Sequence, residues 1–246
     1  MRRRDFVTIS VALTVAWPLA ASAQQTFGRV APIDAKLRST AVWRIVQRDF
    51  PDWYAARLKE AGDFADQNKT DAEIYQHLYR AMATLRRQHA DGALSASSPL
   101  LKMVATAFYS NLAQLKKHSV NICFEFIARG EASPGIVALA HGSPYADWLQ
   151  AQMESVFQAI ADGRKSPRKH PPAIAADYEV LKADLKKLGW TNADLQTFSD
   201  EKALANAGPE KVCQLVHDWF AAQLAIKDPN IQMRLLVDSL RPVIAG

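Results

Sequence analysis

Two glutamates and a histidine lie close together in the sequence and could carry acid–base chemistry. Glu125 and Glu131 are followed by His141, on the far side of a connection that contains Gly135. Carboxyl and imidazole groups that share a cleft can pass protons to and from a substrate, which is the chemistry of hydrolases and lyases. Such catalysis needs a carboxyl group with a perturbed pKa in a cleft, and the spacing alone does not specify one. These three residues are therefore the candidates for an enzymatic function, without a defined reaction.

The other histidines and the cysteines form no familiar metal-binding or nucleophilic motif. No two of the six histidines are four residues apart, and H-E-x-x-H, C-x-x-C, C-x-x-C-H and G-x-S-x-G are all missing. Cys213 and His217 would share a helix face and could form a thiolate–imidazole pair or supply two metal ligands. The apolar neighbours Val212 and Leu215 instead favour a buried, unreactive cysteine. We predict no metal and no cofactor.

The two cysteines, Cys123 and Cys213, predict a single disulfide. An even number of cysteines is what an exported protein with one bond would contain. Bridging requires Cα atoms within about 7 Å of each other. The alternative is two buried thiols that pack as small apolar side chains.

The N-terminal residues predict export. Three arginines at positions 2–4 precede the apolar run 6–21, which ends in Ala21-Ser22-Ala23, a pattern that signal peptidases cut. An uncleaved anchor is the alternative, but this run contains Pro18 and is shorter than the roughly 20 residues of a spanning helix. We expect a signal peptide over 1–23 and a mature periplasmic or secreted bacterial protein over 24–246, without a transmembrane segment. The pair Arg3-Arg4 resembles a twin-arginine signal, so both that route and the general route stay open.

Charge excludes one class of partner and indicates another. The net charge of +5 falls to +3 without the signal peptide, which takes away three arginines and one aspartate. This excess is too small and too scattered for a nucleic-acid-binding face. The basic residues that do cluster lie in segment 163–172, which three prolines and a glycine predict to be an exposed loop: Arg164, Lys165, Arg168 and Lys169. We expect them to contact an anionic envelope component or an acidic protein, or else to keep a linker solvated.

Apolar residues recur at helical spacing along most of the chain, with no sustained alternation. Leu101, Val104, Phe108, Leu112 and Leu115 form one such stripe. We therefore predict an all-α, single-domain bundle of about eight or nine helices, with 120–129 as the central and most buried one. The expected helices are 34–49, 51–66, 71–90, 98–117, 120–129, 144–162, 172–188, 209–226 and 229–241, with shorter helical turns at 191–199 and 200–206.

Together these features favour a non-enzymatic exported protein that binds another protein or an envelope component. The alternative is a hydrolase or lyase that acts on envelope material through Glu125, Glu131 and His141. A pocket that joins these three residues would favour the enzyme, and an apolar surface patch would favour the binding protein.

Overall fold

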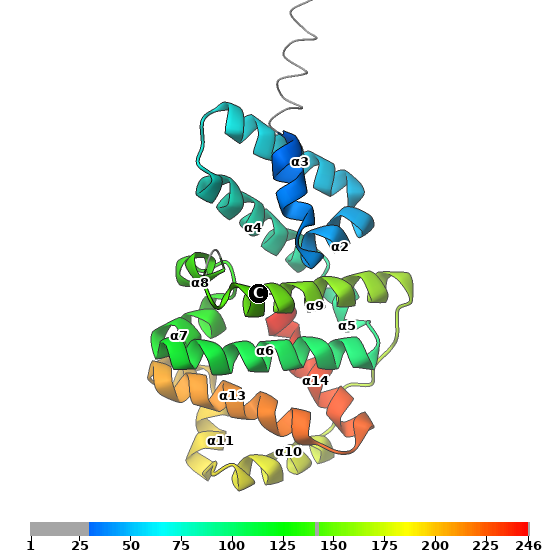
Figure 1. Ribbon diagram of the computed structural model, residues 1–246. Helices are drawn as coiled ribbons and strands as arrows, with labels where there is room; N and C mark the ends of the chain where they lie inside the picture. Colours follow the sequence, from blue (N-terminus) through cyan, green and yellow to red (C-terminus); the bar gives the residue numbers. More distant parts are fainter. Residues whose placement is uncertain (1–29, 141–142, 246) are drawn as a thin grey trace, which may run out of the picture.

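The computed structural model describes residues 30–140 and 143–245, and within them every regular element is a helix. The expected signal peptide and His141 lie outside the described residues. Residues 30–38 are helical and precede the labelled helices (Figure 1). The labelled helices are α2 (Ala41–Asp49), α3 (Pro51–Asp66), α4 (Asp71–Gln88), α5 (Ala90–Leu94), α6 (Ser98–His118), α7 (Val120–Arg129), α8 (Pro134–Leu139), α9 (Ala146–Lys165), α10 (Ala175–Lys187), α11 (Asn192–Ser199), α12 (Glu201–Asn206), α13 (Pro209–Ala225) and α14 (Pro229–Ala245).

The expected all-α class is confirmed, whereas the expected number of helices is too small for the described part of the chain. The expected helix 34–49 is broken at Ser39 and Thr40, whose hydroxyl groups donate to the carbonyl oxygens of Lys36 and Leu37 and so compete with the helix. The expected helix 71–90 ends at Gln88, and α5 follows as a separate short element. The short helix α8, which begins at Pro134, was not predicted.

Helix α14 also differs from the prediction, because it continues through Pro242 to Ala245 instead of ending at 241. Proline has no amide hydrogen, so the carbonyl oxygen of Asp238, four residues earlier, loses its usual helical donor. The helix nevertheless continues, and it remains well packed on both sides of the proline, with Leu240 and Ile244 completely buried.

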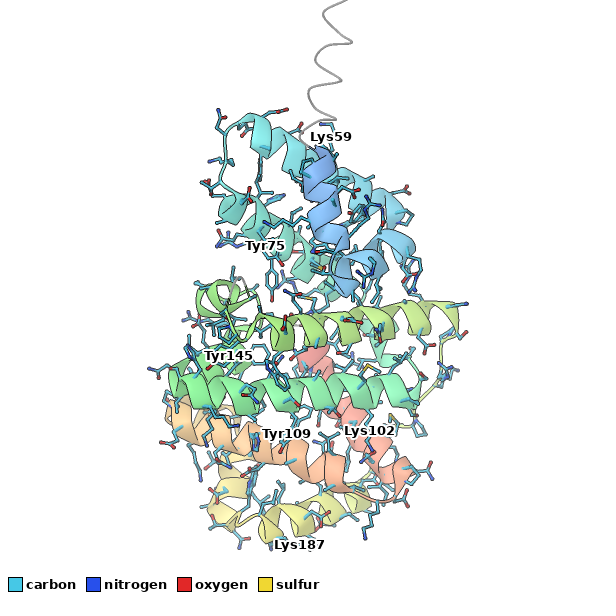
Figure 2. All side chains as sticks on the ribbon, in the orientation of Figure 1. Lys59, Tyr75, Lys102, Tyr109, Tyr145 and Lys187 are labelled. Atoms are coloured by element: carbon cyan, nitrogen blue, oxygen red, sulfur yellow. A yellow bond between two sulfur atoms is a disulfide. The ribbon has the colours of Figure 1, made fainter. Side chains whose placement is uncertain are left out.

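The helices stack in successive layers. The N-terminal helices α2–α4 lie on one side of α9, and α9, α6 and α13 follow one another, with α10 and α11 at the far end (Figure 1). Helix α14 packs against α6, α5 and α13. Side chains fill the space between α4 and α9 (Figure 2).

The most buried helix is α9, not the expected 120–129. Helix α9 has ten buried residues, including Gln152 and Gly163, whereas α7 has only Cys123 and Phe126. The reason is position, because α9 lies between two layers of helices and α7 lies nearer the edge. Gly163 lets α9 approach α5 closely, since a Cβ atom there would collide with the backbone of Gly92.

Helix α10 belongs to a second, smaller apolar core that it shares with α13 and α14. Its buried members are Leu181, Leu185, Trp190, Leu215, Ala222, Ile226 and Leu235. Helices α11 and α12 follow α10 and contain no buried residue. We call α10, α11 and α12 the cap helices, because they cover one side of α13 and α14.

One ion pair joins the cap helices to α14. Arg234 donates two hydrogen bonds to Asp177, from Nε at 2.7 Å and from Nη2 at 2.6 Å. Asp177 also accepts a hydrogen bond from the backbone amide of Ile174 at 2.9 Å. These bonds, led by those from Arg234, lower the pKa of Asp177 to about 2. The folded state therefore prefers the ionised carboxylate.

This pair should make stability depend on pH in the acid range. Because its pKa is lowered on folding, Asp177 stabilises the protein above the unfolded pKa near 4, and the effect disappears as the pH falls towards 2. Asp177→Asn should therefore melt at a lower temperature than the wild type at pH 7. The melting temperatures of the two proteins should approach each other as the pH falls from 4 to 2. Thermal unfolding followed by circular dichroism tests this expectation. A difference that stays constant down to pH 2 would contradict it.

Cys123 of α7 and Cys213 of α13 lie at disulfide distance, as predicted. Their Cα atoms are 6.1 Å apart, and both residues are completely buried. The pair joins two helices that are 90 residues apart in the chain.

Candidate ligand-binding cavity

A cavity of about 740 Å³ lies between α7, α13, α14 and the cap helices. Its volume falls within the range of small-molecule sites, roughly 300–1,000 Å³. Its wall is contributed by residues from α4 to α14, so the site is formed only in the complete fold.

Aromatic rings form much of the wall. The inner part of the wall contains three buried phenylalanines, Phe108, Phe126 and Phe220. The ring centroid of Phe108 lies 5.5 Å from that of Phe126 and 4.9 Å from that of Phe220. Nearer the cap, Phe198 stacks on Trp219 with centroids 4.5 Å apart. The indole of Trp219 is fixed by a hydrogen bond of 2.9 Å to Ser239 Oγ. The cavity therefore offers a large apolar, aromatic surface to a ligand.

A buried ion pair forms the polar end of the cavity. Arg86 and Glu131 line it, and each is only 1 % exposed. Arg86 Nη1 lies 2.6 Å from Glu131 Oε2. Glu131 Oε1 accepts a hydrogen bond of 2.7 Å from Gln152, whose own oxygen accepts one of 2.7 Å from Asn111. Gly130, with φ of 70°, ends α7 and directs the chain so that Glu131 enters the interior.

Several polar atoms at this end have no hydrogen-bond partner. They include Nε and Nη1 of Arg86 and Oε2 of Glu131, because the contact between Nη1 and Oε2 does not have hydrogen-bond geometry. Tyr79 and Ser133 are not part of the cavity wall, and their hydroxyl groups are also buried and unpartnered. Burial, together with the nearby charge of Glu131, raises the pKa of Tyr79 well above its usual value, so the phenol stays protonated. A polar group that is buried without a hydrogen-bond partner is costly in a protein interior.

The other end of the cavity reaches the surface. Arg129, Asp238 and Pro242 line it and are exposed. Tyr178 donates a hydrogen bond to Asp238, and burial together with this carboxylate raises the pKa of Tyr178 to about 12. Arg129 has no ion pair within the described part of the chain. The mouth thus carries one cation and one anion.

The predicted acid–base group is not brought together in the described structure. Glu131 lines the cavity, but Glu125 is not part of its wall. Glu125 instead accepts a hydrogen bond of 3.2 Å from the amide of Gly135, in the first turn of α8. His141 lies outside the described residues.

Sequence reasoning missed Arg86, the partner of Glu131. Arg86 and Arg87 occupy the last turn of α4, where basic residues ordinarily interact with the helix dipole in water. The spacing of Arg86 could have indicated its burial, because Arg86 follows Met82 by four residues and Tyr79 by seven. It therefore lies on the apolar face of the helix.

The basic segment 163–172 differs from its predicted form. Residues 163–165 are the last turn of α9, and the irregular part begins at Ser166. The error arose because Gly163 packs inside the fold and does not end the helix. The remaining segment is anchored at Arg168, whose amide donates to Ser95 O at 2.8 Å, and at His170, whose ring nitrogen lies 2.8 Å from Ala96 O.

Two of its four basic side chains already have internal partners. Arg164 lies over the ring of Phe50, with its guanidinium carbon 4.5 Å from the ring centroid, and Arg168 pairs with Asp162 at 2.7 Å. Lys165 and Lys169 are exposed and have no ion pair in the described ranges. Contact between the full set of four and an anionic partner stays a prediction.

The alternative chemistry at Cys213 and His217 has no support. Cys213 lies at disulfide distance from Cys123. The Nδ1 atom of His217 lies 3.2 Å from Asp218 Oδ1. The ring centroid of His217 lies 4.6 Å from that of Tyr109, a residue of α6 that lies beside α13 (Figure 2). The described residues contain no group of three side chains placed to ligate a metal ion. Over the same ranges, none of the helices combines the length and the apolar character needed to cross a bilayer.

Comparisons with protein-family models, with curated proteins and with solved structures found no match to this chain.

Proposed function

We propose that this chain is an exported binding protein that holds a small amphipathic molecule in the cavity between α7, α13, α14 and the cap helices. One observation carries the proposal: an aromatic cavity of about 740 Å³ ends in a buried arginine with unused N–H groups. An apolar ligand body would contact Phe126, Trp219 and Phe220, and a polar group would reach Arg86. This arrangement of a largely apolar wall with a few convergent polar groups is typical of small-molecule sites.

The state of Glu131 supports binding over acid–base catalysis. A general acid or base must exchange its proton with a substrate. The carboxylate of Glu131 is instead held by the cation of Arg86 and the amide of Gln152. The sequence analysis expected another protein or an envelope component as the partner. The proposal names a small molecule instead.

Filling the cavity should abolish binding. Val216 of α13 lines the cavity and is half-buried, so Val216→Trp would place an indole in the space that the ligand needs. We expect this variant to bind Nile red, an uncharged, polarity-sensitive dye, at least tenfold more weakly than the wild type, which corresponds to about 1.4 kcal/mol. Fluorescence titration measures the affinity, and circular dichroism checks that the variant is folded.

The matched control is Val180→Trp on α10. Val180 is 39 % exposed and does not belong to the wall of this cavity, so the same change of side chain should leave Nile red binding unaltered. Equal affinity of the wild type and folded Val216→Trp would count against the cavity as the binding site.

A further inference from the structure

We infer that the ligand presents an uncharged carbonyl-type acceptor, as in an amide, ester or ketone, to the buried end of the cavity, and not a carboxylate. The inference rests on the proposed function and names the chemical class of its ligand. Two independent features carry it: the unused hydrogen-bond donors and the charge that is already balanced.

The unused groups include two donors, Nε and Nη1 of Arg86, and one acceptor, Oε2 of Glu131. A guanidinium group has five N–H bonds and accepts none. Within the described residues the only oxygen in ion-pair contact with Arg86 is Glu131 Oε2, and Nε and Nη1 remain without hydrogen bonds. Glu131 Oε1 accepts from Gln152, whereas Oε2 lies 2.6 Å from Arg86 Nη1 without forming a hydrogen bond. A ligand group that satisfies Arg86 must therefore supply an acceptor atom.

The balance of charge decides which acceptor fits. Arg86 and Glu131 neutralise each other, and both are buried. Tyr79, the titratable neighbour, is held in its neutral phenol form. A ligand carboxylate would add a second anion beside Glu131 in a desolvated site, which is unfavourable. Arg129 also lines the cavity, but it is exposed, so solvent screens its charge. An uncharged carbonyl oxygen accepts from Arg86 without this cost.

Pyrene-1-carboxamide and pyrene-1-carboxylate test the inference, since they share the ring system and differ at the polar group. Their affinities for the wild-type protein at pH 7 are measured by pyrene fluorescence. We expect the amide to bind at least tenfold more tightly than the carboxylate, and Val216→Trp to weaken the binding of the amide. A carboxylate that binds as tightly as the amide, or more tightly, would overturn the inference and leave the proposed function standing. If neither compound binds, both the inference and the proposed function are contradicted.

Glu131→Gln makes the test specific to charge. This change keeps an amide oxygen for Gln152 but removes the anion, so that Arg86 is no longer neutralised. The preference should therefore shift towards the carboxylate by at least tenfold relative to the wild type. The matched control is Glu125→Gln, which removes the same charge outside the cavity wall and should leave the preference unchanged. An unchanged preference in folded Glu131→Gln would contradict the role of Glu131.

Discussion

Loss of the bond between Cys123 and Cys213 should lower the free energy of unfolding by about 4–5 kcal/mol. The bond would close a span of 90 residues, and in the chain-entropy model a loop of that length destabilises the unfolded state by this amount. For a chain of this size, we expect the melting temperature to fall by roughly 10–15 °C. Differential scanning calorimetry with and without a reductant measures the change.

The double variant Cys123→Ala/Cys213→Ala provides the control. It should melt near the temperature of the reduced wild type, lowered by a small loss of packing, and it should not respond to a reductant. Two titratable thiols in the denatured, unreduced wild type would show that the bond is absent and would refute the prediction.

Arg86→Met should destabilise the protein by about 3–5 kcal/mol, because it leaves the carboxylate of Glu131 buried without its counter-ion. Chemical denaturation monitored by tryptophan fluorescence measures the loss. This is the second large effect that we expect, and it arises from charge, since methionine retains much of the apolar volume of the arginine stem.

The double variant Arg86→Met/Glu131→Gln separates charge from packing. It has no buried charge at this position and keeps an oxygen that Gln152 can donate to, so most of the lost stability should return. If the double variant were as unstable as Arg86→Met, the packing of Arg86 and not its charge would explain the loss. The double variant should also bind both pyrene compounds less well than the wild type binds the amide, because the donors of Arg86 are gone.

Local sequence signals predicted much of the fold. Helix α4 begins at 71 as expected, and the capping box of Thr70 and Glu73 accounts for this start, because its hydrogen bonds form within one turn. Pro99 and Pro209 likewise stand at the first turns of α6 and α13. The errors occurred where packing outweighs local preference: helix α14 continues past Pro242, and Gly163 lies inside α9.

The candidate site was harder to predict, because its main interaction joins distant parts of the chain. Glu131 was identified as a residue of interest, but its partner Arg86 lies 45 positions earlier, on α4. Nothing local separates Arg86 from its solvated neighbour Arg87 except its phase on the apolar face. The pairing becomes visible only when α4 is packed beside the turn after α7.

The low burial of α11 and α12 has a consequence for how fast a ligand enters and leaves the cavity. These two helices supply Phe198 and Leu204 to the cavity wall, although neither helix contains a buried residue. Segments with so little buried surface open locally at a small fraction of the free energy of global unfolding. The residence time of a bound molecule would then follow the opening rate of α11 and α12, while its affinity follows the rigid walls on α7, α13 and α14.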